Sequence, residues 1–221
     1  MRKEYKTVFN CASVEMEEKK SRFISSVKPA SSEEEALDFI HSLKSRYRDA
    51  THNVYAYFIG GENTVQRFSD DGEPSGTAGM PVLEVIKRME VQDLVVVVTR
   101  YFGGTLLGAA GLIRAYGKSA ALGIEAAAVV CKKLCMEASV VMEYGMLGKL
   151  QSVIAGKGYA IKNVIYGQDV EIIVFVPVED VLKFTLLINE ASNGKAIVEM
   201  GEKTYVALDG EGKPVKPDRN R

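Results

Sequence analysis

The run Leu-Val-Val-Val-Val at residues 94–98 constrains the fold of this chain more than any other sequence feature. A strand with one solvated face alternates apolar and polar residues, whereas a strand buried on both faces is apolar throughout. We therefore expect a central strand here, ended by Gly103-Gly104. Periodicity and turn residues predict strands near 5–9, 13–18, 22–27 and 54–59, helices over 32–46, 81–89 and 110–128, and a loop over 68–79.

The pattern changes at residue 133, where the segments begin to follow the order β-α-β-β-α-β, which is that of a ferredoxin-like domain. The expected segments are strands over 134–144, 160–166, 170–176 and 196–208, with amphipathic helices over 147–154 and 179–191. We predict an α+β chain with one domain at residues 1–132 and another at 133–208. The segment 209–221 is rich in proline and charge, which predicts a disordered tail.

Composition excludes several classes of protein. The 221 residues are 47% hydrophobic with a formal net charge of −1, so nucleic-acid binding would need a local basic patch. Cys11, Cys131 and Cys135 lack C-x-x-C spacing, which favours reduced thiols over a disulfide framework or a zinc site. The sequence has no signal-peptide core and no run of membrane-spanning length. We expect a cytoplasmic protein with no membrane or DNA partner, and we assign it no metal and no cofactor.

Gly-Lys-Ser at residues 117–119 is the end of the phosphate-binding motif G-x-x-x-x-G-K-[ST]. The leading glycine of that motif would fall on Leu112, and the surrounding segment, rich in alanine and leucine, favours a helix. In a helix, Arg114, Lys118 and Glu125 share one face. Arg114 and Lys118 are then either an anion-binding surface or part of an ordinary solvated face.

Three acids, Asp70, Asp71 and Glu73, stand in the expected loop over 68–79. Their oxygens could hold a divalent cation, but the spacing is not that of a calcium loop, and Asp-Asp-Gly and Glu-Pro are common turn formers. We favour a structural turn. His52, which precedes the strand at 54–59, is either a general base or a hydrogen-bonded structural histidine, and the structural alternative is favoured.

The exit of the central strand carries Arg100, Tyr101, Gly103 and Gly104. Backbone N–H groups of a glycine turn and a following helix attract anions, the arginine adds a fixed charge, and the tyrosine adds a stacking face. The alternative is a buried exit whose arginine pairs with the acidic loop, because an unpaired buried charge is costly. If Arg100 faces a ligand, its replacement by methionine will weaken anion binding at little cost in stability.

The same segments resemble a known family. Ser-Asp-Asp-Gly-Glu-Pro-Ser-Gly-Thr-Ala-Gly at 69–79, Val-Val-Thr-Arg-Tyr-Phe-Gly-Gly at 97–104 and Gly-Leu-Ile-Arg-Ala-Tyr at 111–116 closely resemble the signature of the YigZ/IMPACT family. The resemblance implies a first domain like domain 2 of ribosomal protein S5 and, from both domains together, a likeness to the last two globular domains of elongation factor G. It also implies a link to translation, since eukaryotic IMPACT proteins restrain translational stress signalling. Those relatives carry an RWD domain that this sequence does not show.

Two functions from different classes remain open at this stage. The first is a non-enzymatic protein that regulates translation by binding RNA, the ribosome or a translation-related protein. Its contacts would be Arg100, Tyr101, Gly103, Gly104, Arg114 and Lys118, with a second basic-aromatic contact at 46–48. The alternative is an enzyme acting on a small phosphorylated or peptide-like substrate in a pocket formed by His52, Asp70, Asp71, Glu73 and Arg100. Convergence of those side chains on one cleft would favour the enzyme.

Overall fold

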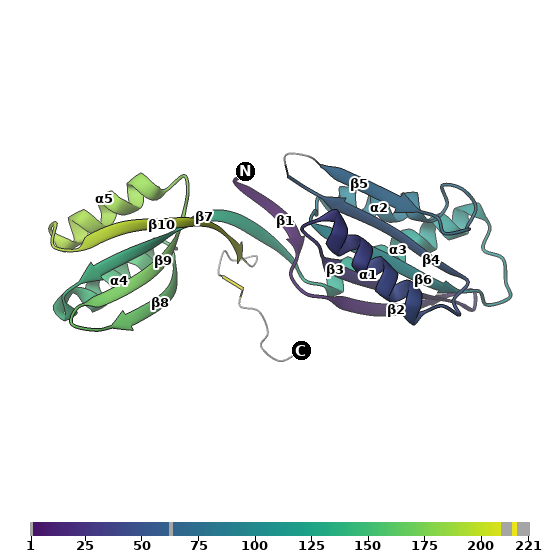
Figure 1. The fold of residues 1–221 in the computed structure, drawn as a ribbon, viewed down its shortest axis with the longest axis horizontal. Coiled ribbons are helices and arrows are strands. Elements are labelled where there is room, and N and C mark those ends of the chain that lie inside the picture. Colours follow the sequence, from purple (N-terminus) through teal and green to yellow (C-terminus); the bar gives the residue numbers. More distant parts are fainter. Residues whose placement is uncertain (1, 62–63, 209–213, 216–221) are drawn as a thin grey trace. The chain divides into compact units, whose positions relative to one another are not determined.

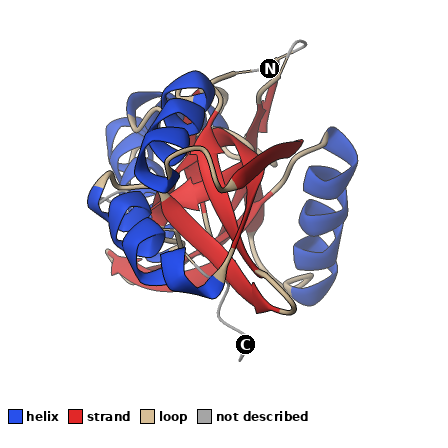
Figure 2. Cartoon of the chain, turned by 90° about the vertical axis from the view of Figure 1, so that its left-hand side faces the viewer, coloured by secondary structure: helices blue, strands red, loops and turns tan. Residues whose placement is uncertain are grey.

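The computed structural model describes residues 2–61, 64–208 and 214–215. Contacts divide the chain into two compact units, one of residues 5–130 and one that joins residues 2–4 to the chain from residue 131 onward. Both units mix strands with separate helices, as the α+β prediction requires (Figures 1 and 2). None of the helices in the described residues is long and apolar enough to cross a bilayer.

The elements up to residue 126 are β1 (Glu4–Val8), β2 (Ala12–Glu18), β3 (Ser21–Pro29), α1 (Glu33–Arg46), β4 (His52–Ile59), β5 (Val65–Ser69), α2 (Gly79–Arg88), β6 (Leu94–Tyr101) and α3 (Ala109–Ala126). Those that follow are β7 (Val129–Met142), the 3-10 turn η1 (Tyr144–Met146), α4 (Leu147–Gly156), β8 (Ala160–Tyr166), β9 (Val170–Pro177), α5 (Val181–Ser192) and β10 (Ile197–Leu208).

The first unit contains an antiparallel sheet with the strand order β2-β3-β6-β4-β5, so β6, the strand expected to be central, lies in the middle. Successive residues of β6 belong alternately to two hydrophobic cores. Val96 and Val98 pack in the core formed with α2 and α3, while Val95 and Val97 pack in the core formed with α1. Helices therefore cover both faces of the sheet, which is why residues 94–98 of the strand are all apolar.

One strand of this sheet does not follow from the sequence. Residues 68 and 69 were expected in a loop, but they are the last two residues of β5, an edge strand that pairs with β4. Its five residues show no clean alternation, and Arg67 and Phe68 are exposed. A short edge strand needs little burial, so its composition gives little indication of a strand.

The position of His52 also differs slightly from the prediction. It was expected just before the strand at 54–59, but it is the first residue of β4 and pairs with Arg100.

The helices follow from local chemistry. The hydroxyl of Ser32 caps α1 by accepting the N–H of Glu35, and the Glu35 carboxylate accepts the N–H of Ser31 in return. Gly117, Lys118 and Ser119 lie within α3, so the helix prediction for this segment is confirmed. A phosphate-binding loop is therefore ruled out here.

The second unit follows the order β7-α4-β8-β9-α5-β10. Its sheet runs β1-β7-β9-β8, with β10 also paired to β7, and the pairings of β7, β8, β9 and β10 are antiparallel. Leu150 and Ile154 of α4 and Phe184 and Ile188 of α5 fill the core against β9. The ferredoxin-like prediction is confirmed. Most of the predicted disordered tail lies outside the described residues, although Pro214 bridges to Leu208 at the end of β10.

Candidate functional site

Arg100 lies near the end of β6 with its side chain on the face covered by α2 and α3. The guanidinium carbon is 5.5 Å from the ring centre of Phe23 and 5.6 Å from that of Phe102. Only 5% of the residue is exposed, so the charge lies beside the two aromatic rings and out of solvent. A buried guanidinium must be compensated, so its partners decide its role.

The compensating group is Glu73 of the acidic loop. Its Oε1 atom accepts a hydrogen bond from Arg100 Nη1 at 2.5 Å and another from the hydroxyl of Tyr116 at 2.7 Å. Arg100 Nη2 donates to Ser21 Oγ at 3.3 Å. These four residues are called the buried network below. Burial, reinforced by the Glu73 carboxylate, raises the pKa of Tyr116 far above its usual value, so this hydroxyl stays a neutral donor.

His52 lies beside the buried network with one nitrogen already engaged. Its Nδ1 is 2.8 Å from the backbone carbonyl oxygen of Asp71, and because a carbonyl can only accept, Nδ1 carries the proton. Its Nε2 faces Glu73 Oε1 at 3.9 Å. The acidic loop thus fixes the orientation of the imidazole and leaves only Nε2 available for chemistry.

Asp70 uses both carboxylate oxygens to hold its own loop and the start of α2. Oδ1 accepts the N–H groups of Ala78 at 3.1 Å and Gly79 at 2.8 Å, and Oδ2 accepts that of Gly76 at 2.9 Å. An acid at a helix N-terminus satisfies donors that have no partner within the helix. This carboxylate is a cap for α2.

Asp71 is tied to two other elements. Oδ1 accepts Lys44 Nζ from α1 at 2.6 Å, and Oδ2 accepts the backbone N–H of Asn53 in β4 at 2.6 Å. The residue sits at a φ of 47°, in the left-handed region. Four acid and base residues were proposed for an enzyme pocket, and the structure brings together the side chains of two of them, His52 and Glu73. The carboxylates of Asp70 and Asp71 instead bind backbone N–H groups and, for Asp71, Lys44.

Tyr101 lies on the other face of the sheet from Arg100. Its hydroxyl donates to Asp49 at 3.0 Å, and the guanidinium carbon of Arg22 lies 5.3 Å from its ring centre. Desolvation and the carboxylate of Asp49 raise its pKa. The aromatic-cation motif recurs nearby, where the Arg46 guanidinium lies 5.3 Å from the ring centre of Tyr47. Tyr101 therefore does not share a surface with the arginine that precedes it.

Gly103 is required by a close approach to the turn between β2 and β3. A methyl group added there would lie 2.0 Å from the carbonyl carbon of Lys20, a distance no structure tolerates. Its N–H donates to Ser21 Oγ at 3.2 Å, so it adjoins the buried network. Gly104 has a φ of +81° but faces open space, and its role is conformational.

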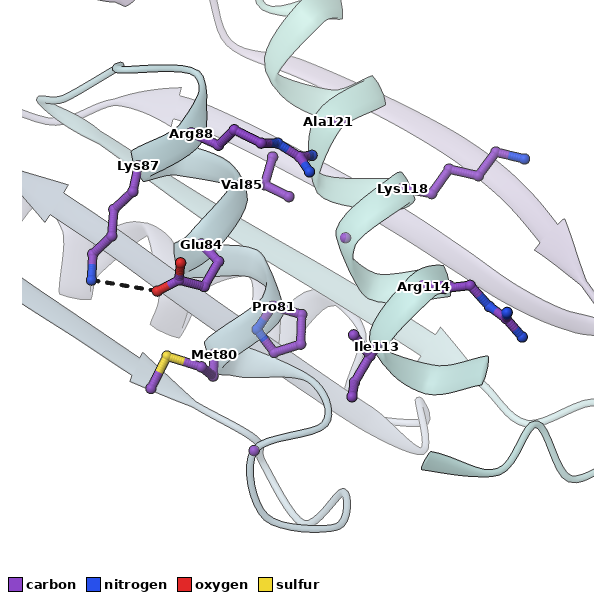
Figure 3. A pocket seen from close by; sticks show the side chains of 12 residues that line it. Met80, Pro81, Glu84, Val85, Lys87, Arg88, Ile113, Arg114, Lys118 and Ala121 are labelled. Carbon is purple, nitrogen blue, oxygen red and sulfur yellow. Dashed lines mark ion pairs between the residues drawn. The ribbon is translucent and has the colours of Figure 1, made fainter. Parts of the chain in front are cut away.

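Arg114 and Lys118 are exposed on α3, one turn apart, and line two adjoining cavities. The smaller, called the hollow, has a volume of about 290 Å³ and also receives Lys19 and Glu18 from the end of β2 and the turn that follows it. The larger, called the trough, lies between α2 and α3 and has a volume of about 1080 Å³ (Figure 3). Arg88 and the ion pair of Lys87 with Glu84 lie on its α2 side.

Four cations that line these cavities are available to a ligand. Among the residues that the structure describes, none of Lys19, Arg88, Arg114 and Lys118 forms an ion pair or a side-chain hydrogen bond. These four residues are called the basic strip below. Sequence reasoning found two of them and missed Lys19 and Arg88, which come from other parts of the chain. Groups of three or more His, Cys, Asp or Glu suited to a metal are absent from the described residues.

Comparison with known proteins gives the family. Residues 19–124 match the Impact N-terminal domain, and residues 140–195 match a domain of unknown function, DUF1949. The IMPACT family member YvyE of Bacillus subtilis is 42% identical over 202 residues, which cover 91% of this chain and 93% of that protein. The chain belongs to the IMPACT family. The IMPACT family member YigZ of Escherichia coli is 33% identical over 178 residues, covering 80% of this chain and 87% of YigZ.

Among solved structures, the crystal structure of a hypothetical protein has 30% sequence identity and a TM-score of 0.59, covering 91% of this IMPACT family chain and 99% of its own. The similarity to a vertebrate member covers a shorter segment. Protein IMPACT of Bos taurus is 45% identical over 62 residues, which are 27% of this chain and 19% of the bovine protein. The family signature expected from the sequence is therefore confirmed.

Proposed function

We propose that this IMPACT family member is a cytoplasmic, non-catalytic regulator of translation that binds structured RNA, including that of the ribosome, through the basic strip. The observation that carries the proposal is the gathering of Lys19, Arg88, Arg114 and Lys118 on one side of a protein whose net charge is −1. A local basic patch is the electrostatic signature of phosphate binding.

The hollow supports phosphate contact in particular. Lys19, Arg114 and Lys118 surround a space of about 290 Å³, in which Glu18 is the only acid among the lining residues described. Exposed cations without acidic partners lose little on binding a phosphate and release its counterions. Contact through phosphates would favour structured RNA of many sequences, since phosphates position a protein without reading bases.

The buried network supports the non-catalytic part of the proposal. Glu73 is committed to Arg100 and Tyr116, and the two aspartates bind Lys44 and backbone N–H groups. A catalytic constellation needs groups that converge on a reacting atom, and these groups converge on one another. The link to translation rests on the family, because eukaryotic IMPACT proteins restrain translational stress signalling.

The test measures binding of ribosomes and of a structured RNA by filter retention, between about 50 and 200 mM salt. The logarithm of the association constant falls with the logarithm of the salt concentration, and we expect Arg114→Ala with Lys118→Ala to make this slope less steep by about 1.5 to 2. The variant should also bind RNA of every sequence more weakly. The matched control replaces two exposed cations outside the basic strip, Arg67→Ala with Lys149→Ala. Salt-independent binding, or an equal loss in the control, would sink the proposal.

A further inference from the structure

The trough between α2 and α3 has an apolar floor. Pro81 and Val85 of α2 and Ile113 and Ala121 of α3 line it, and Met80 lies at one end (Figure 3). Ile113 is 45% exposed and Met80 is 38% exposed, so apolar side chains face solvent here. Phosphate contacts do not account for these residues, because exposed apolar surface gains nothing from an anion.

The trough is long enough to hold two turns of a helix. Its α3 wall runs from residue 113 through Gly117 to residue 121, and its α2 wall runs from residue 80 to residue 88. At 1.5 Å per residue, each wall is about 12 Å long, or roughly two turns. An amphipathic helix places its apolar anchors at i, i+3 or i+4, and i+7, which span about 10.5 Å and so fit within that length.

The charges on the rims decide what kind of helix fits. Arg88 on one side and Arg114 and Lys118 on the other have no acidic partner among the residues described. The one acid of the rim, Glu84, is already neutralised by Lys87, with 3.6 Å between Oε1 and Nζ. Basic rims over an apolar floor complement a helix with a leucine-type face flanked by acids.

We infer that the trough is a docking site for an acidic amphipathic helix of a partner protein. The chain's own tail does not fit, because residues 209–221 carry three acids against four bases and one aliphatic residue, a valine. Unpaired bases do not fit either, since they stack on aromatic rings and the trough's described lining has none.

The docking site overlaps the RNA surface. Arg114 and Lys118 line both the trough and the hollow, so a helix in the trough neutralises two of the cations that would hold phosphate. This consequence rests on the proposed function, whereas the docking itself does not. A partner with such a helix would release RNA from the protein, which is a direct route to regulation.

The test uses the full chain and a fluorescent synthetic helix of about 18 residues, with leucines at helical spacing and glutamates on the flanks. Anisotropy is measured for this peptide, for its scrambled sequence and for a version with lysine in place of glutamate. We expect binding of the first peptide only. Ile113→Ser should weaken that binding about tenfold, because it removes an apolar anchor, and should leave RNA binding unchanged. Leu122→Ser is the matched control, on the same helix at 37% exposure and outside the trough.

Each further outcome has one meaning. Equal binding of the scrambled peptide, or equal effects of Ile113→Ser and Leu122→Ser, overturns the docking site. RNA binding without peptide binding overturns the docking site and leaves the proposed function standing. Peptide binding without RNA binding does the reverse. Self-association of the chain that is lost in Ile113→Ser would make a second copy the occupant and overturn the inference of a separate partner.

Discussion

The first unit holds a buried arginine, in the buried network, and a group of exposed cations, the basic strip, which differ in burial and in partners. In the buried network, Arg100 is 5% exposed and is held by Glu73, Ser21 and two aromatic rings. In the basic strip, Arg114 and Lys118 are exposed and have no acidic partner among the residues described. The same residue types therefore serve different ends. A buried cation organises its surroundings because it must be compensated, while an exposed one is available to a ligand.

The largest effect on stability is expected from Arg100→Met. The substitution leaves the Glu73 carboxylate buried without its counter-charge, so we expect a loss of about 3 to 5 kcal/mol in the free energy of unfolding, measured by urea denaturation. Such a loss is the opposite of the small stability cost expected from the sequence if Arg100 faces a ligand, and it agrees with the other alternative, pairing with the acidic loop. The double variant Glu73→Gln with Arg100→Met should recover part of the loss, since it removes both charges. A change below about 1 kcal/mol in the single variant would contradict the network.

A smaller effect is expected at Gly103, which adjoins the buried network through Ser21. Its replacement by alanine forces a methyl group against the backbone of Lys20, and we expect a loss of about 2 kcal/mol, read as a lower thermal midpoint. Gly104→Ala is the comparison, because it meets open space and strains only a φ of +81° at a cost of about 1 kcal/mol. Equal losses in the two variants would show that the contact with the turn is not tight.

The smallest effect on stability belongs to the basic strip. Arg114→Ala with Lys118→Ala removes two exposed charges that form no ion pair within the part of the chain that the structure describes. We expect the free energy of unfolding to change by no more than about 0.5 kcal/mol. Urea denaturation measures the effect of both this variant and Arg100→Met, so the two can be compared directly. A loss of more than about 2 kcal/mol in the free energy of unfolding would show that the basic strip stabilises the fold, and it would contradict the distinction between the strip and the buried network.

The sequence was sufficient for elements with strong periodicity and insufficient for contacts between distant segments. The run at 94–98 predicted a central strand, and the order of segments after residue 133 predicted the second fold. β5 was missed because a short edge strand needs little burial. Pairing of Arg100 with the acidic loop was one of two alternatives, and burial decided between them. Lys19 and Arg88 were missed because only the packing of α2, α3 and the turn after β2 brings them to one surface.

Because both faces of β6 are buried, hydrogen exchange of its backbone amides reports the stability of the first unit. It is hydrogen-bonded to β3 on one side and to β4 on the other, and every residue from Leu94 to Arg100 is buried. Amides in such a position exchange with deuterium only when the whole unit opens, so their exchange rates measure its global stability. The outer turns of α2 and α3 open by local fraying at lower free energy. A ligand seated on these helices would slow exchange there first, and the protected amides would map where it lies.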